Sequence, residues 1–215
     1  MFDWKLQFLG GRLCDDVKDC THLVLLNGRR SQKLLEGICL GKNIMSCDWI
    51  LDGYKNGAFM DTLDYFLRDE EIERQLGYSC KRSVLRARHR QIFEGVQFYV
   101  TQSVLPDYET IKTLIELAGG KVQAEKPTAN YIAKCIETDE AFLIIACDVD
   151  VRSMSYLAEC NFPIYNVDLI LTSILRQNIE LHPVFRLMGI VRQHRHAYSN
   201  PPTIVPRPMP IQMPP

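Results

Sequence analysis

The sequence has no long apolar segment and no excess of either charge. Its 25 Lys and Arg residues nearly balance its 26 Asp and Glu residues, so the chain as a whole does not attract nucleic acid or acidic lipid strongly. No apolar run approaches the roughly 20 residues of a membrane-spanning helix. Residues 1–8 also lack the apolar region of a signal peptide. We therefore expect a soluble, intracellular protein with no membrane partner.

Local motifs of common enzyme sites are missing as well. The sequence contains no G-x-x-x-x-G-K-[ST], no H-E-x-x-H and no G-x-S-x-G, which would supply a phosphate cradle, a metal or a nucleophile. Cys20 and His22 could form a Cys–His pair, but close residues on one strand are far more often core packing. We expect a protein that is not an enzyme and has no cofactor.

The eight cysteines show no spacing typical of a metal site. None pair as C-x-x-C, and none lies beside a histidine pattern that would hold zinc. Most lie in apolar runs, where a reduced thiol behaves as a small hydrophobic group. Free thiols in a reducing compartment are the expected state, with a zinc site as the remaining alternative.

The composition is that of a folded protein, with 47% hydrophobic and 24% charged residues, and 215 residues allow one large or two small domains. Residues 30–54 are the most informative stretch. Apolar residues recur on one face of residues 31–40, which predicts an amphipathic helix, and residues 43–45 read as a buried strand. Ser46 and Asp48 are expected to cap a second helix, which Trp49 anchors in the core.

The two halves of the sequence repeat one another. Residues 9–13 (LGGRL) match residues 118–122 (AGGKV), and residues 48–51 (DWIL) match residues 168–171 (DLIL). The first pair is 109 residues apart and the second 120, so the second copy carries about eleven extra residues, expected within 125–141. Alternating strands and helices predict a tandem α/β protein with mainly parallel sheets. The expected strands span residues 12–14, 22–26, 43–45, 96–101, 142–146 and 162–165, and the expected helices residues 1–9, 31–40, 48–54, 79–90, 107–118, 151–160 and 167–177.

Three segments have biased composition. Residues 57–77 are rich in acids, and residues 79–90 form a basic helix that we expect to pair with those acids. Binding of phosphates by the basic helix is the alternative, which a steep salt dependence would mark. Seven of the last sixteen residues are proline, which predicts an extended, disordered tail.

The order of these features resembles the BRCT domain. Residues 21–24 (THLV) and 48–50 (DWI) carry the resemblance most specifically, together with the Gly-Gly pair after a helix. The resemblance implies two BRCT repeats, each a small parallel sheet flanked by helices, packed head to tail. The expected repeats span residues 1–66 and 92–180, with an inter-repeat linker at 67–91 and the tail at 181–215.

The same resemblance implies a function and a site. Tandem BRCT modules bind phosphoserine peptides at the junction of the repeats, and they belong to nuclear DNA-damage-response or chromatin-regulating proteins. The implied phosphate-binding residues are Lys33 and Ser31, and the implied contacts to the +3 residue of the peptide are Arg30, Val104 and Leu105. The expected partners are phosphorylated nuclear proteins. A phospho-independent scaffold, or a nucleic-acid-binding protein using the basic linker, is the alternative.

The first copy departs from the family in length. In the second copy 22 residues separate Gln97, at the start of the first strand, from Gly119, whereas only nine residues precede Gly10. A strand, a loop and a three-turn helix do not fit into nine residues. We therefore expect the first repeat to lack its first strand, most of its first helix and the Ser/Thr-Gly pair that helps hold phosphate in this family. Weak phosphopeptide binding is the expected consequence.

Overall fold

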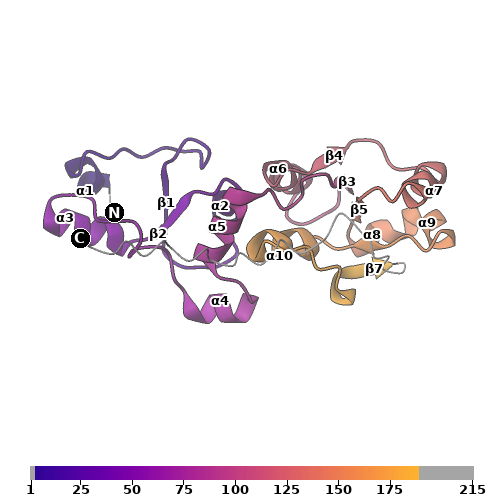
Figure 1. Ribbon diagram of the computed structural model, residues 1–215. Helices are drawn as coiled ribbons and strands as arrows, with labels where there is room; N and C mark the ends of the chain where they lie inside the picture. The colour runs from indigo at the N-terminus through magenta and orange to yellow at the C-terminus, as the bar shows by residue number, and fades with distance from the viewer. Residues whose placement is uncertain (1–2, 189–215) are drawn as a thin grey trace, which may run out of the picture.

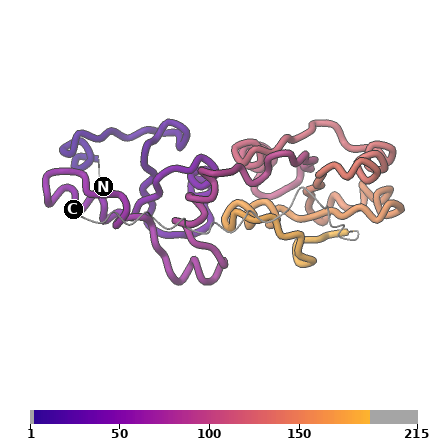
Figure 2. The backbone as a smooth tube through the Cα atoms, in the orientation of Figure 1, coloured from indigo at the N-terminus to yellow at the C-terminus, as the bar shows by residue number. Residues whose placement is uncertain are grey.

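The computed structural model describes residues 3–188, which form two lobes lying side by side in an elongated molecule (Figure 1). The chain passes through the first lobe, then through two linker helices, and then through the second lobe (Figure 2). Each lobe has its own sheet, and the two sheets are not joined by strand pairing.

The first lobe holds a small parallel sheet. It consists of β1 (His22–Leu25) and β2 (Asn43–Ser46), with His22 opposite Asn43. Phe66 forms an antiparallel bridge with Met45 at the other edge of β2. The helices of this lobe are α1 (Asp3–Phe8), α2 (Gln32–Cys39) and α3 (Asp48–Asn56).

The linker contributes α4 (Glu70–Leu76) and α5 (Cys80–His89). Asp69 caps α4 by accepting a hydrogen bond from the Ile72 amide, and Gly77 ends the helix with a positive φ of 66°. Glycine suits this position because a left-handed conformation carries no side-chain penalty there.

The second lobe holds a five-stranded sheet in the order β4-β3-β5-β6-β7, parallel except for β7. Asp107 caps α6 through the Thr110 amide. The elements of this lobe are β3 (Gln97–Val100), α6 (Tyr108–Leu117), β4 (Lys121–Gln123), α7 (Ala129–Glu137), β5 (Phe142–Ile145), α8 (Asp148–Val151), η1 (Arg152–Met154), α9 (Tyr156–Glu159), β6 (Ile164–Tyr165), α10 (Asp168–Arg176), η2 (Pro183–Phe185) and β7 (Arg186–Met188).

One hydrophobic core runs through both lobes. The helix α2 contacts α6 and α10 of the second lobe, and α5 contacts α2 and α10. Fully buried apolar side chains come from all four of these helices, among them Ile38, Val84, Ile115 and Ile174. The amphipathic helix predicted at residues 31–40 therefore buries its apolar face against two helices of the second lobe.

Several predictions about elements are confirmed and others are wrong. The extra residues of the second copy form α7, inside the predicted range 125–141. Residues 12–14 form no strand, and the helix expected over 151–160 is divided among α8, η1 and α9. Neither Ser46 nor Asp48 caps α3, because the N-cap position is occupied by Cys47. Cys47 has a helical backbone conformation, and its side chain makes no capping hydrogen bond.

Part of the segment predicted to be a disordered tail is ordered. Residues 183–188 form η2 and β7, and β7 pairs with β6 while Leu187 and Met188 pack on a core cluster of the second lobe. This pairing keeps the segment ordered because it satisfies backbone groups and buries apolar side chains. The proline-rich part of the predicted tail lies outside the described residues.

All eight cysteines are free thiols. Residues 3–188 contain no group of His, Cys, Asp or Glu that could hold a metal ion. None of the helices in this range is long and apolar enough to cross a membrane.

Candidate functional site at the junction of the two lobes

The start of α2 presents the two residues predicted to bind phosphate. Ser31 is the N-cap, and its Oγ accepts a hydrogen bond of 3.3 Å from the Leu34 amide. Lys33 is exposed in the first turn, where the positive end of the helix dipole also favours an anion. The apolar face of α2 fixes this orientation, since Leu34 and Ile38 are fully buried. Amide, hydroxyl and ammonium groups therefore lie together at one exposed helix end.

Close packing of α2 on β1 depends on Gly37. A Cβ atom at this position would lie 2.6 Å from the Leu23 Cδ2 atom. The glycine thus lets the helix approach the sheet closely enough to bring Lys33 beside the strand. Lys33 lines a cavity of about 980 Å³ that extends along β1.

Arg30 directly precedes the N-cap Ser31 and lines a second cavity of about 490 Å³ between the lobes. Its Nη1 atom donates a 2.7 Å hydrogen bond to Oδ1 of Asp168, at the start of α10. Leu105 lines this inter-lobe cavity too and is 85% exposed. The pair of Arg30 and Leu105 is therefore available to a ligand lying across the junction.

Val104 is placed differently from the prediction. Its side chain is only 2% exposed and packs in the joint core, so it cannot touch a bound peptide directly in this conformation. Its role is to anchor the loop that carries Leu105. The structure thus places Ser31 and Lys33 together at the start of α2, where Lys33 lines the larger cavity. Arg30 and Leu105 line the smaller one.

Four polar residues of the inter-lobe cavity were not predicted from the sequence: Ser103, Asp148, Asn166 and Asp168. The match between Asp48 and Asp168 marked both as helix-start residues but gave no sign that Asp168 faces Arg30. The buried Oδ1 atom of Asn166 has no hydrogen-bond partner. A polar ligand in this cavity could donate a hydrogen bond to Asn166 Oδ1 and contact the ion pair of Arg30 and Asp168.

The inter-lobe cavity also contains the thiol of Cys147. Burial, together with a hydrogen bond to the Asp150 carboxylate, raises the pKa of Cys147. Because the thiolate is the reactive form, this shift lowers the reactivity of the thiol at neutral pH.

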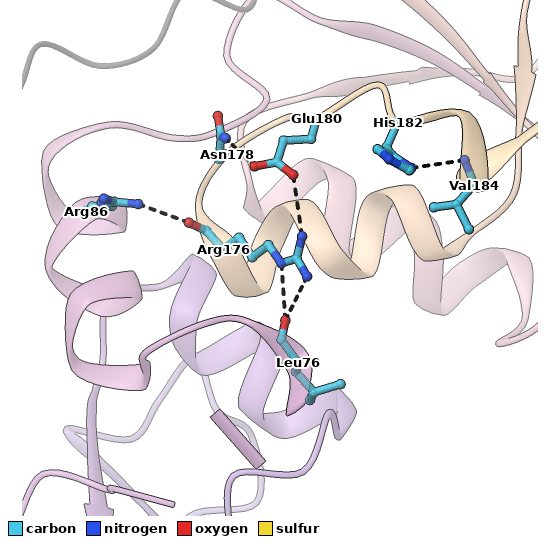
Figure 3. A network of polar contacts seen from close by, with 7 residues as sticks. All are labelled: Leu76, Arg86, Arg176, Asn178, Glu180, His182 and Val184. Atoms are coloured by element: carbon cyan, nitrogen blue, oxygen red, sulfur yellow. Dashed lines mark hydrogen bonds and ion pairs between the residues drawn. The ribbon is translucent and has the colours of Figure 1, made fainter. Parts of the chain in front are cut away.

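The basic residues of α5 do not pair with acids as predicted. Arg88 donates to the carbonyl of Gly41 at 2.7 Å and to the Asn43 side chain at 2.6 Å. Arg86 reaches the carbonyl of Arg176 at 3.2 Å (Figure 3). Helix C-termini leave carbonyls without partners, and a guanidinium group satisfies them well. These arginines join α5 to both lobes.

Arg176 extends this junction to α4. Its Nε and Nη2 atoms donate to the carbonyl of Leu76 at 3.2 and 3.1 Å, while Nη1 lies 3.4 Å from Glu180 (Figure 3). Gly77 lies close to this guanidinium group, since a Cβ atom there would lie 2.9 Å from Arg176 Nη2 and would displace it. The linker is thereby fixed against the end of α10.

Comparison with known proteins agrees with this architecture. A family model described as BRCT domain matches residues 91–185. The chain belongs to the BRCT family. It is 31% identical over 178 residues, or 82% of its length, to PAX-interacting protein 1 of Mus musculus. It is 29% identical over 79% of its length to Mediator of DNA damage checkpoint protein 1 of Homo sapiens. The chain spans only 17% and 8% of these two BRCT proteins.

Solved BRCT structures share the fold of both lobes. The BRCT5-BRCT6 domains of Brc1 from S. pombe superpose with a TM-score of 0.68 at 24% identity, covering 83% of this chain and 88% of that one. A complex of Rtt107p with a phosphorylated histone gives a TM-score of 0.58 at 16% identity, covering 85% of this chain and 83% of that one. Both lobes thus have the fold of these tandem domains, and the first contains only two strands within the described residues.

Proposed function

We propose that this chain is a phosphoserine-peptide-binding scaffold module of a nuclear DNA-damage-response or chromatin-regulating protein. The observation that carries the proposal is the exposed start of α2, where Ser31 and Lys33 lie beside a junction lined by Arg30 and Leu105. A phosphate at α2 would leave the rest of an extended peptide free to cross toward α10. The proposed repeats are residues 1–66 and 92–180, joined by 67–91.

The chemistry of the helix start suits a dianionic phosphate. Lysine supplies a compact positive charge, and the first amides of a helix point outward without intrahelical partners. Charge-assisted hydrogen bonds of this kind contribute about 1.5–3 kcal/mol each. Arg30, held by Asp168, is proposed to read the +3 residue of the peptide with Leu105.

Similar proteins support the proposed binding of a phosphorylated partner and the proposed role in the DNA-damage response. The chain is similar to a mediator of DNA damage checkpoint protein, and Rtt107p, which has the same fold, is solved with a phosphorylated histone. Partners of this chain are accordingly proposed to be phosphorylated nuclear proteins, and its location the nucleus.

A nucleic-acid-binding role for α5 finds less support. Arg86 and Arg88 direct their guanidinium groups to backbone carbonyls, so part of the positive charge of α5 is already engaged within the protein. Phospho-independent binding of protein remains the alternative that an unphosphorylated peptide tests.

The deciding measurement is the affinity of matched serine and phosphoserine peptides for Lys33→Glu and the parent chain. We expect the parent to prefer the phosphopeptide, and the variant to lose at least about tenfold in phosphopeptide affinity, because a cation is replaced by an anion. Lys134→Glu makes the same charge change on the exposed surface of α7 and is the control. Titration calorimetry reports the affinities and circular dichroism the fold.

Two results would contradict the proposal. Equal affinity of the parent chain for the serine and phosphoserine peptides would favour a phospho-independent scaffold. An unchanged affinity in Lys33→Glu would place the phosphate elsewhere. Arg30→Ala separates the two parts of the site, since it should weaken selection at the +3 position and leave phosphate dependence in place.

A further inference from the structure

The loop between β1 and α2 is held at Gly28 by two residues of the linker. Gly28 is buried, whereas its neighbours Asn27 and Arg29 are exposed. Its amide donates a 3.0 Å hydrogen bond to Oδ2 of Asp69, and its carbonyl accepts a 2.6 Å hydrogen bond from the hydroxyl of Tyr78. These partners lie 41 and 50 residues further along the chain. Both backbone polar groups of Gly28 are therefore bonded to groups outside the loop.

Asp69 and Tyr78 are themselves fixed in place. The other carboxylate oxygen of Asp69, Oδ1, caps α4 by accepting a 3.2 Å hydrogen bond from the Ile72 amide. Tyr78 is buried and packs in the core that the two lobes share. A Cβ atom at position 28 would lie 2.8 Å from the Tyr78 hydroxyl oxygen, so glycine permits this close approach. The linker thus gives a firm attachment to a loop whose other residues are exposed.

Local hydrogen bonds connect Gly28 to the start of α2. The Arg29 amide donates to the Asn27 side chain at 3.1 Å, and the Arg29 carbonyl accepts from the Ser31 amide at 2.7 Å. Ser31 in turn caps α2. Only Arg29 and Arg30 separate Gly28 from Ser31. A displacement of Gly28 is therefore transmitted to the cap of α2.

The opposite end of α4 is bonded to the second lobe. The carbonyl of Leu76 accepts both hydrogen bonds from Arg176, near the end of α10 (Figure 3). Asp168, at the start of the same helix, forms the ion pair with Arg30. The helix α4 thus joins the loop to α10, and Arg30 is held from two directions, by Asp168 and through Gly28.

We propose that Asp69 and Tyr78 are positioning residues of the phosphopeptide site, which fix through Gly28 the direction in which the start of α2 faces the phosphate. This role rests on the proposed function. Neither side chain is among the residues that line the two cavities, so the role does not include contact with the peptide. The contribution to affinity is preorganisation, because a loop that is already ordered loses less conformational entropy when a ligand binds.

A purely structural role makes a different prediction. Loss of either hydrogen bond to Gly28 would then lower the stability of the fold, while the protein that remains folded would bind its ligand unchanged. A positioning role lowers the affinity of the folded protein for the phosphorylated ligand specifically. The ratio of phosphoserine to serine peptide affinity, measured on folded protein, separates the two roles.

Tyr78→Phe removes the hydroxyl and keeps the buried ring. The probe is the phosphoserine peptide that the parent chain selects best from a degenerate library, together with its serine form. Titration calorimetry should show phosphoserine affinity at least about threefold weaker in the variant, with little change for the serine form. Tyr156→Phe is the matched control, because its hydroxyl also donates to a backbone carbonyl, that of Pro127, and Tyr156 lines neither cavity. The control should leave both affinities unchanged.

Asp69→Ser tests the other hydrogen bond to Gly28. Serine is a good N-cap, so α4 stays capped, but its single oxygen replaces Oδ1 and not Oδ2. We expect phosphoserine affinity to fall by at least about threefold here too. In both variants amide hydrogen exchange at residues 28–34 of the free protein should be faster than in the parent. Tyr156→Phe should leave the exchange of these residues unchanged.

The opposite results overturn the proposal. If the parent prefers the phosphoserine peptide and either Tyr78→Phe or Asp69→Ser keeps the full preference, the positioning role is wrong and the proposed function stands. Equal losses of phosphoserine affinity in Tyr78→Phe and Tyr156→Phe, or unchanged exchange at residues 28–34, would likewise overturn the positioning role alone. A parent chain that binds both peptides equally would overturn the proposed function, and the positioning role with it.

Discussion

Single residues at the junction stabilise the molecule mainly by donating to backbone carbonyls. Arg176 donates twice to Leu76, Arg86 donates to Arg176, and the Ser83 hydroxyl donates to Leu175. Each bond satisfies a carbonyl at or near a helix end that the helix itself leaves unpaired. Removing such a donor costs more than the bond alone, because the acceptor stays partly buried without a partner.

We expect Arg176→Ala to lower the free energy of unfolding by about 1–2 kcal/mol, since the Leu76 carbonyl then loses both of its donors. Urea denaturation of the variant and the parent measures the difference. Arg74→Ala is the matched control, because that side chain is 77% exposed and pairs only with Glu71 of the same helix. A change of about 0.5 kcal/mol or less is expected for the control. Equal losses in both variants would contradict a specific role of Arg176.

The elements with the strongest sequence patterns were predicted correctly. The continuous apolar run of β5 and the capped, periodic helix α6 both appear where expected. Residues 12–14 have the composition of a strand, but no strand of the described residues pairs with them. Composition alone was therefore misleading there. The helix expected over 151–160 is interrupted at the 3-10 segment 152–154, where Met154 is buried in the second core cluster.

Sequence was less informative about the site. The family resemblance identified Lys33 and Arg30 as site residues, but the two residues line different cavities. This separation depends on the angle at which α2 packs against the second lobe. That angle is set by buried contacts among α2, α6 and α10, between residues far apart in sequence. For the same reason Val104 could not be recognised as a buried residue beside an exposed Leu105.

The helix α2 is the element on which both lobes depend. Its Ile38 side chain is fully buried in the joint core. Ile38→Ala should lower the free energy of unfolding by about 2–5 kcal/mol, because the lost contacts leave a cavity at the lobe junction. Leu85→Ala on α5, where the side chain is 42% exposed, should cost less than about 1 kcal/mol. Thermal melts followed by circular dichroism compare the variants, and similar losses would contradict a central role of α2.

In the molecule as a whole, the shared core predicts that both lobes unfold together. Both tryptophans of the chain, Trp4 and Trp49, lie in the first lobe, so their fluorescence reports that lobe alone. Circular dichroism at far-ultraviolet wavelengths reports helices of both lobes. We expect the two signals to give coincident transitions in urea. Fluorescence that changes at clearly lower urea than circular dichroism would show that the first lobe unfolds independently.

The arginine–carbonyl bonds of α5 and α10 have a consequence for the response to ionic strength. Dissolved salt shortens the Debye length to about 3 Å at 1 M, which weakens exposed ion pairs most and hydrogen bonds to neutral carbonyls less. Within residues 3–188, Arg30–Asp168 is the one ion pair that joins the lobes, and it lies in the inter-lobe cavity. Concentrated salt is thus expected to loosen the cavity while the lobes keep their orientation. A ligand of this cavity would then be released by concentrated salt while the protein stays folded.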